Sequence, residues 1–463
     1  MNQLSLYQQT SKLDYRQKLI DLLSRDLDFH DQESKYATHD IHAFPAKFPP
    51  QLPKKFIIEL TIPGEVVLDP MAGSGTTVLE AILADRCGIG FDIDPLALKI
   101  SKSKIIPLDL FEVYTLEKKI VNNARIEVME NYIKFEEALQ SLGDIETNKF
   151  INHWFAPETQ VELLILAKEI EKINNQPIRN FFEVVLSSII ITKSGGVSLA
   201  LDLAHTRPHR AKLVFKKNGD LLFENGKDNA SSSRINILKK TLRSAIDEFQ
   251  KRIKQNLKSL SRIDFNGYGN KLLMADAQKL PLKSNTVGLI VTSPPYASNA
   301  IDYMRAHKFS LVWLGYPIYN LGKIRKKYIG GEVIQDIHLE ELPSNINLII
   351  KEITRLDKKK GMVLFKYYSE IKRALKEMYR VLKPGKAAIV VVGSSTMRGV
   401  DTEIHLCLSE IGKSIGFEVP KIGLRKLDRN RRMLPAGTNL NLKSQIQQRM
   451  HHEYVIGFYK PLD

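Results

Sequence analysis

The chain has 463 residues, 43% of them hydrophobic, which is enough to bury one large core carrying an insertion, or two separate cores. Lysine and arginine total 68 against 52 acidic residues, and the formal charge of +16 favours polyanionic partners, although a basic surface also serves solubility. The two cysteines, Cys87 and Cys407, lack a CxxC spacing and argue against a disulfide framework or a zinc site, and no apolar run reaches the roughly 20 residues of a membrane helix.

The first part of the chain predicts one strand–helix–strand unit. Short apolar runs that close on turn signals indicate buried strands, and the segment between them has helical spacing. The predicted elements are a charged, largely helical region at 1–40, a proline-punctuated aromatic loop at 42–50, a helix at 54–61, strands at 65–70 and 87–92, and a helix at 76–85 between these strands.

Between residues 105 and 265 the pattern becomes mainly helical, which predicts an insertion. Residues 211–223 alternate in polarity around Asn218-Gly219, a hairpin-turn signal that predicts two short antiparallel strands. Helices are predicted at 160–174, 181–191 and 235–260.

Strand and helix signals alternate again in the last part of the chain. Because these strands are apolar throughout, they predict a largely parallel sheet that helices cover on both faces. The predicted elements are strands at 271–276 and 287–291, a helix at 369–382 that leads through Lys383-Pro384-Gly385 into a strand at 387–392, and a last strand at 453–459.

A glycine-rich turn, Asp69-Pro70-Met71-Ala72-Gly73-Ser74-Gly75-Thr76-Thr77, joins the first predicted strand to its helix. Glycines allow the backbone to approach a ligand closely, and the helix N-terminus offers unpaired N–H groups. A tight strand-to-helix turn uses glycines for structural reasons as well, so this motif alone leaves both interpretations open.

Two aspartates, Asp92 and Asp94, close the next strand. An acidic side chain at this edge of a parallel sheet suits the two hydroxyls of a ribose. Either residue could instead cap the helix that follows, and capping is at least as good an interpretation for Asp94, which precedes Pro95. The two motifs together predict a cofactor that contains a nucleoside, and a dinucleotide would fit them equally well.

The segment Thr292-Ser293-Pro294-Pro295-Tyr296 follows a buried strand and decides between these interpretations. The two prolines lack a backbone N–H and stiffen the loop. The carbonyl oxygens of the loop therefore remain as acceptors with a fixed orientation. Such acceptors suit an amino group, whose nitrogen lone pair is then drawn out of conjugation and aimed at a methyl donor. Tyr296 would stack on a flat base. The alternative, a proline-rich turn beside a core tyrosine, does not account for the two motifs upstream.

In combination these motifs resemble those of the DNA amino-methyltransferases, the N4-cytosine and N6-adenine enzymes. The tetrapeptide Ser293-Pro294-Pro295-Tyr296 is similar to the serine version of their [DNS]-P-P-[YFW] motif, which is most like the N4-cytosine type. The resemblance implies that this tetrapeptide binds the target amino group and that the cofactor is S-adenosyl-L-methionine. It implies cofactor contacts from Phe44, Pro45, Lys47, Asp69, Pro70, Gly73, Gly75, Thr76, Asp92, Asp276 and Ala277.

The resemblance also implies the fold, an α/β Rossmann-like class I methyltransferase fold with a seven-stranded mixed sheet and an inserted, mainly helical domain. We expect residues 1–105 to form the first part of the methyltransferase domain, 106–268 the insertion, and 269–463 the second part with the catalytic loop. The glycine-rich turn precedes the tetrapeptide, whereas many serine-type enzymes have the reverse order.

Basic residues in loops suit contacts with phosphates and base edges, although a solvated basic face is the simpler interpretation of each. Residues 318–362 form a second candidate region for target recognition, and Lys239, Lys240 and Arg243 are expected on one helix. The nucleic-acid contacts predicted are Arg207, His209, Arg210 and Arg305.

We therefore predict a DNA (cytosine-N4-specific) methyltransferase that acts on a cytosine flipped out of double-stranded DNA. Three alternatives stay open: an N6-adenine DNA methyltransferase, a transfer-RNA guanine-N2 methyltransferase, and an inactive module that binds nucleic acid. We expect no metal, since the histidines lack a metal-ligand spacing, and no membrane contact. A cognate restriction endonuclease is a candidate partner. We expect that the polar N-terminus is not a signal peptide and that the protein is cytoplasmic and nucleoid-associated.

Overall fold

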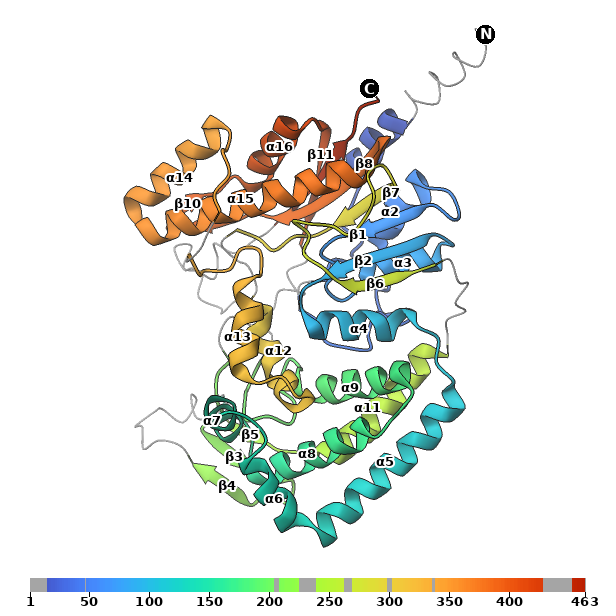
Figure 1. Cartoon of the computed structure of the whole chain (residues 1–463), viewed down its shortest axis with the longest axis vertical. Helices are drawn as coiled ribbons and strands as arrows, with labels where there is room; N and C mark the ends of the chain where they lie inside the picture. The colour runs from blue at the N-terminus through green and yellow to red at the C-terminus, as the bar shows by residue number, and fades with distance from the viewer. Residues whose placement is uncertain are drawn as a thin grey trace.

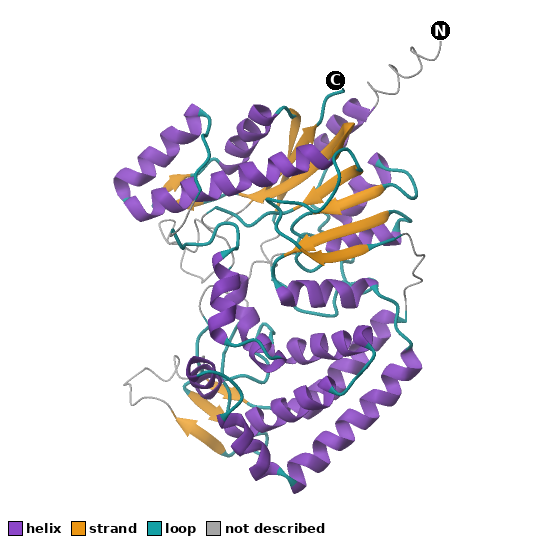
Figure 2. Cartoon of the chain, viewed as in Figure 1, coloured by secondary structure: helices purple, strands orange, loops and turns teal. Residues whose placement is uncertain are grey.

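The protein is represented by a computed structural model that describes residues 15–45, 47–203, 208–224, 239–261, 269–297, 302–334, 338–427 and 452–462. Figures 1 and 2 show a sheet layer in the upper part of the molecule and a mainly helical part below it. No helix in the described ranges is long and apolar enough to cross a membrane.

The sheet has seven strands in the order β11-β12-β8-β7-β1-β2-β6. All neighbours from β8 to β6 pair in parallel, whereas β12 pairs antiparallel with both β8 and β11. The predicted seven-stranded mixed sheet of a Rossmann-like fold is therefore confirmed. The strands are β1 (Val66–Asp69), β2 (Cys87–Asp92), β6 (Lys271–Met274), β7 (Val287–Thr292), β8 (Leu382–Gly393), β11 (Glu418–Lys426) and β12 (His452–Tyr459).

Helices cover both faces of this sheet, which explains why its central strands are apolar at successive positions. Neighbouring residues of one strand enter different cores: Leu289 packs with α2 (Gln51–Leu60) and the helix at 15–24, and Ile290 packs with α14 (Ser344–Leu356), α15 (Lys358–Val381) and α16 (Ile404–Ile415). Helices α3 (Thr76–Leu83) and α4 (Pro95–Ile105) pack near β2 and β6, and a short hairpin, β9 (Thr396–Met397) with β10 (Val400–Asp401), follows β8.

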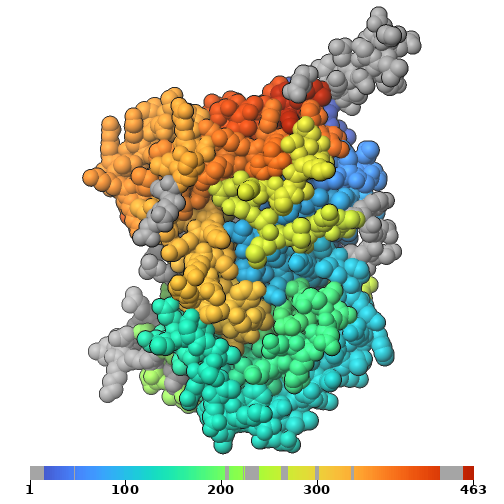
Figure 3. All heavy atoms as spheres, in the orientation of Figure 1, coloured from blue at the N-terminus to red at the C-terminus, as the bar shows by residue number. Residues whose placement is uncertain are grey.

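The described part of residues 106–268 is mainly helical, as predicted. Its core also takes in the segment after the catalytic loop, helices α12 (Tyr303–Leu311), η1 (Val312–Leu314) and α13 (Ile318–Lys326), through Phe309, Trp313 and Leu321. Figure 3 shows this orange segment between the sheet part and the helical part. The elements of the insertion are α5 (Leu110–Glu130), α6 (Tyr132–Gln140), α7 (Ile145–Trp154), α8 (Pro157–Glu171), α9 (Gln176–Ile190), β3 (Leu213–Phe215), β4 (Leu221–Glu224), β5 (Lys239–Thr241) and α11 (Ala245–Leu260).

The predicted hairpin at 211–223 forms as β3 and β4, with Gly219 at a positive φ of 93° in its turn. The helix predicted at 235–260 is wrong at its start. Lys239 and Lys240 lie in β5, which pairs with β3, and Arg243 lies before α11, so the three cations do not share a helix. Pairing with a strand distant in sequence overrode the local helical spacing here.

Three other predicted elements differ in extent. Residues 25–40 are turns and loops, so the helical region at 1–40 is described as helix only at 15–24. Helix α15 begins at Lys358, earlier than the predicted 369. The predicted turn at Lys383–Gly385 belongs to β8, where Gly385 has φ of 73° and the register with β7 shifts between Val287 and Leu289. Proline and glycine therefore mark an irregularity within a strand at this position.

Candidate active site

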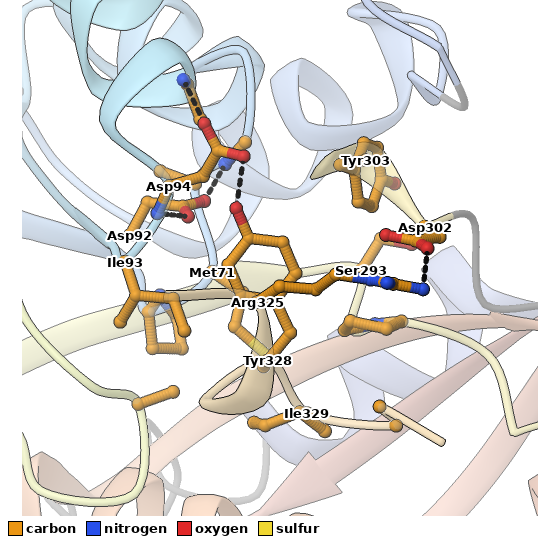
Figure 4. A pocket seen from close by; sticks show the side chains of 18 of the residues that line it. Met71, Asp92, Ile93, Asp94, Ser293, Asp302, Tyr303, Arg325, Tyr328 and Ile329 are labelled. Atoms are coloured by element: carbon orange, nitrogen blue, oxygen red, sulfur yellow. Dashed lines mark hydrogen bonds and ion pairs between the residues drawn. The ribbon is translucent and has the colours of Figure 1, made fainter. Parts of the chain in front are cut away.

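A pocket of about 340 Å³ lies at the carboxyl ends of β1, β2, β6 and β7, the edge at which parallel α/β sheets bind ligands. Figure 4 shows Asp92, Ser293 and Tyr328 converging on it from different elements. The structure thus brings together residues from all three sequence motifs. The predicted site residues that line the pocket are Phe44, Lys47, Asp69, Pro70, Gly73, Thr76, Asp92, Asp276, Ala277, Ser293, Pro295 and Arg305.

The other predicted residues lie outside the pocket lining. Pro45, Pro294 and Tyr296 are direct neighbours of lining residues. Gly75 has a structural reason to be glycine, since its φ is +75° and a Cβ atom there would lie 2.9 Å from the side chain of Ser101. His209 and Arg210 are not part of the lining, and Arg207 is outside the described residues.

The glycine-rich turn is held against β2 and α4 by hydrogen bonds of its own backbone. The Gly73 amide donates to Asp92 Oδ2 at 2.8 Å, and Ser101 Oγ donates to the Gly73 carbonyl at 2.7 Å. Gly73 has a φ of +49°, and a Cβ atom there would meet the ring of Phe44 at 3.4 Å. The turn therefore packs directly under the aromatic loop, and both segments form one wall of the pocket.

Two carboxyl groups at the floor of this pocket, one buried and one half-buried, have raised pKa values. Burial raises the pKa of Asp92 to about 7, and the nearby charge of Asp94 adds to this effect. Burial likewise raises the pKa of Asp69 to about 6, despite the hydrogen bond that Thr292 Oγ1 donates to it at 2.7 Å. A positively charged ligand would favour the ionised form of both groups.

The catalytic loop is anchored to two other strands of the sheet. Ser293 Oγ donates to the carbonyl oxygen of Val391 in β8 at 3.0 Å, and its side chain remains partly exposed at the pocket. Tyr296 Oη donates to Glu453 Oε1 at 3.1 Å, and Glu453 is itself paired with the buried Arg425. The Ser293 hydroxyl uses its one hydrogen in the bond to Val391. Its oxygen can therefore only accept further hydrogen bonds, through its lone pairs.

Sequence reasoning missed a buried network beside the cofactor loop. Asp94 caps α4 by accepting from the amides of Leu96 and Ala97 at 2.8 and 3.0 Å. Helix capping was one of the two interpretations that the sequence left open for this residue. It also accepts from His307 Nδ1 at 2.7 Å and Tyr328 Oη at 2.5 Å. Burial alone would raise the pKa of Asp94, but these bonds lower it below its ordinary value. No local signal marks His307 or Tyr328, because the contacts are made only by packing of distant segments.

Replacement of the buried His307 by alanine should lower the free energy of unfolding by about 2–4 kcal/mol, because a hydrogen bond to a carboxylate is lost and a cavity is left. Chemical denaturation measures this loss. The control His338→Ala removes a histidine that is 80% exposed and should change stability by less than about 0.5 kcal/mol. Equal stability of both variants would contradict the role assigned to the Asp94 network.

The segment after the catalytic loop closes the pocket on the side facing the helical part. Tyr303 stacks on Phe44, with ring centroids 5.3 Å apart and an interplanar angle of 24°. Asp302 pairs with Arg305 Nε at 2.8 Å and Arg325 Nη2 at 2.5 Å, and Figure 4 shows the bond to Arg325 at the pocket edge. Of the residues in this wall, only Arg305 was named from the sequence, as a nucleic-acid contact.

Comparisons with known proteins agree with this geometry. A family model described as DNA methylase (N6_N4_Mtase) matches residues 6–103. The type II methyltransferase M.MvaI of Kocuria varians is 24% identical over 432 residues, 86% of this chain and 88% of the relative. The type II methyltransferase M.AvaI of Nostoc sp. is 23% identical over 401 residues, 77% of this chain and 74% of the relative.

A solved structure described as a DNA modification methylase from Thermus thermophilus shares 19% identity over 21% of this chain and 38% of its own, with a TM-score of 0.16. An overlap this partial carries no argument about the fold. No group of three or more potential metal ligands occurs among the described residues. The family model and the type II relatives confirm the resemblance to the DNA amino-methyltransferases that the sequence predicted.

Proposed function

We propose that the chain transfers a methyl group from S-adenosylmethionine to N4 of cytosine in double-stranded DNA. The observation that carries this proposal is the position of Ser293 in the pocket that Asp92 and Asp276 also line. One side of the pocket thus suits a nucleoside cofactor and the other an amino group. The serine at the start of the tetrapeptide favours cytosine over adenine, by resemblance to the N4-cytosine enzymes.

The residues present fit S-adenosylmethionine. The Asp92 carboxylate accepts from the amides of Gly73 and Asp94 at 2.8 and 2.9 Å, and its oxygens keep lone pairs for ribose hydroxyls. Asp276 and Ala277, which follow β6, would lie along the adenine, and Phe44 with Lys47 would complete the methionine end. When bound, this cofactor supplies an electrophilic methyl group on a positively charged sulfur.

Ser293 and the carbonyl groups around Pro294 would accept the two hydrogens of the target amino group. These acceptors orient the nitrogen and draw its lone pair out of the ring. Because the Ser293 hydroxyl already donates to Val391, and serine is a weak base, the amino proton would leave to solvent. Neither cysteine lines the pocket, so no covalent enzyme intermediate is part of the proposal.

Tyr296 would present its ring to a base that has been flipped out of the duplex. Its hydroxyl is held by Glu453, and that bond limits rotation of the ring. Base stacking on an aromatic side chain is worth about 1–3 kcal/mol. We propose this role because Tyr296 directly follows the pocket-lining Pro295.

Methylation of DNA by the purified protein with isotope-labelled S-adenosylmethionine tests the proposal, with nucleoside mass spectrometry as the readout. The expected product is N4-methylcytosine. N6-methyladenine would preserve the fold and the cofactor site but overturn the interpretation of Ser293. Transfer to transfer RNA alone, or cofactor binding without transfer to any nucleic acid, would contradict the proposal in favour of the RNA enzyme or the inactive module.

A further inference from the structure

Cationic side chains from two distant parts of the chain gather at the mouth of the pocket. Residues 325–327 (Arg-Lys-Lys) stand at the end of α13, and residues 358–360 (Lys-Lys-Lys) form the first turn of α15. Arg325 and Lys360 both line the pocket, so the two groups flank the same opening. We call residues 325–327 and 358–360 the basic rim.

The outer members of the basic rim are exposed lysines, and the charge of Lys359 helps to lower the pKa of the nearby Glu332. Arg325 is paired with Asp302 at 2.5 Å, and Lys360 with Glu332 at 2.8 Å. Lys358 and Lys359 are exposed, as are residues 326–327, and within the described part of the chain no acidic group forms an ion pair with any of these four lysines. The charge therefore points to solvent at the place where a substrate must enter.

Local stability does not explain the lysines of α15. Cations in the first turn of a helix oppose the positive end of the helix dipole, which makes them mildly unfavourable to the helix itself. The floor of the pocket carries three carboxyl groups, Asp69, Asp92 and Asp94, which in their ionised form would repel a polyanion that approached it. A cationic rim around an acidic floor suits a negatively charged substrate that inserts one neutral group into the pocket.

We propose that the basic rim holds the phosphates on either side of the flipped nucleotide, with one contact region on α13 and the other on α15. This inference rests on the proposed function, and it names the part of the protein that binds the DNA backbone. Phosphate contacts position the strand without reading its sequence, so the rim would serve every target sequence equally. The candidate base-reading residues of the insertion, His209 and Arg210, do not belong to the basic rim.

Two double variants test the rim: Lys358→Ala with Lys359→Ala, and Lys326→Ala with Lys327→Ala. None of these side chains lines the pocket, so S-adenosylmethionine binding and kcat at saturating DNA should not change. Affinity for a DNA duplex should fall by roughly tenfold for each pair, and the slope of log K against log salt should decrease by about one per lysine removed. Fluorescence anisotropy with a labelled duplex at several salt concentrations gives both values.

A matched control is Lys118→Ala with Lys119→Ala, an adjacent pair of exposed lysines on α5. Figure 1 places α5 at the opposite edge of the molecule from the start of α15. Equal affinities and salt slopes for the control and both rim variants would overturn the inference. If wild-type protein makes no methylated base in DNA, the proposed function fails, whereas the rim is still judged by its binding data.

Discussion

Replacement of Ser293 by alanine is expected to lower kcat by roughly 10²-fold while the dissociation constant of S-adenosylmethionine stays within about twofold. The hydroxyl oxygen is an oriented acceptor, because the hydroxyl donates a hydrogen bond to the carbonyl oxygen of Val391 at 3.0 Å. An acceptor aimed at the amino group matters most in the transition state, when the nitrogen gains positive charge and its hydrogens become stronger donors. Single-turnover methylation and calorimetric cofactor titration separate the two quantities.

Two variants serve as controls for this result. Ser293→Asn keeps an acceptor oxygen and should retain more activity than the alanine variant. Ser409→Ala removes a hydroxyl in α16 that likewise donates to a carbonyl, that of His405 at 2.7 Å, but lies outside the pocket lining. It should leave kcat unchanged. Equal losses of turnover and of cofactor affinity in Ser293→Ala would contradict the role assigned to this serine.

Replacement of Asp92 by asparagine should weaken S-adenosylmethionine binding by roughly 10²-fold, because hydrogen bonds from ribose hydroxyls to a carboxylate are the strong kind. Asparagine also has a single acceptor oxygen, whereas the two carboxylate oxygens of Asp92 accept from the amides of Gly73 and Asp94. One of these two amides therefore loses its acceptor. Calorimetry of cofactor binding to both proteins measures the change.

The pH dependence gives this variant a sharper test. In the free protein the pKa of Asp92 is raised from 3.8 to about 7, so the folded state keeps a proton that the unfolded chain has lost. The contribution of Asp92 to stability is therefore greatest below about pH 4 and is lost as the pH rises to about 7. Binding of a sulfonium cofactor favours the ionised carboxylate, so affinity should rise between about pH 6 and 8.

This rise should be largely absent in Asp92→Asn, with the remainder coming from Asp69, whose pKa is about 6. Asp109→Asn is the control, since Asp109 is an exposed helix cap of α5 and asparagine caps a helix equally well. Cofactor affinity that is independent of pH in the wild-type protein, or equal in Asp92→Asn, would contradict the assignment of Asp92 to the ribose.

The strands β1, β2 and β7 and the motifs that follow them could be predicted from local sequence patterns. Each is a short apolar run closed by glycine, proline or aspartate, and such signals are local: they depend on residues within about ten positions of one another. The parallel arrangement then places the ends of those strands at one edge. For that reason Asp69, Asp92 and Ser293 could be assigned to a single pocket before its geometry was known.

The rest of the pocket depends on contacts between segments that are distant in sequence. The Tyr303 ring on Phe44, the Asp94–His307–Tyr328 network and the basic rim all join segments far apart in sequence. The strand at Lys239–Thr241 formed against a helical pattern for the same reason. Local periodicity reports which face of an element is apolar, but not which distant segment covers it. That choice depends on packing and on the pairing of buried polar groups across the whole chain.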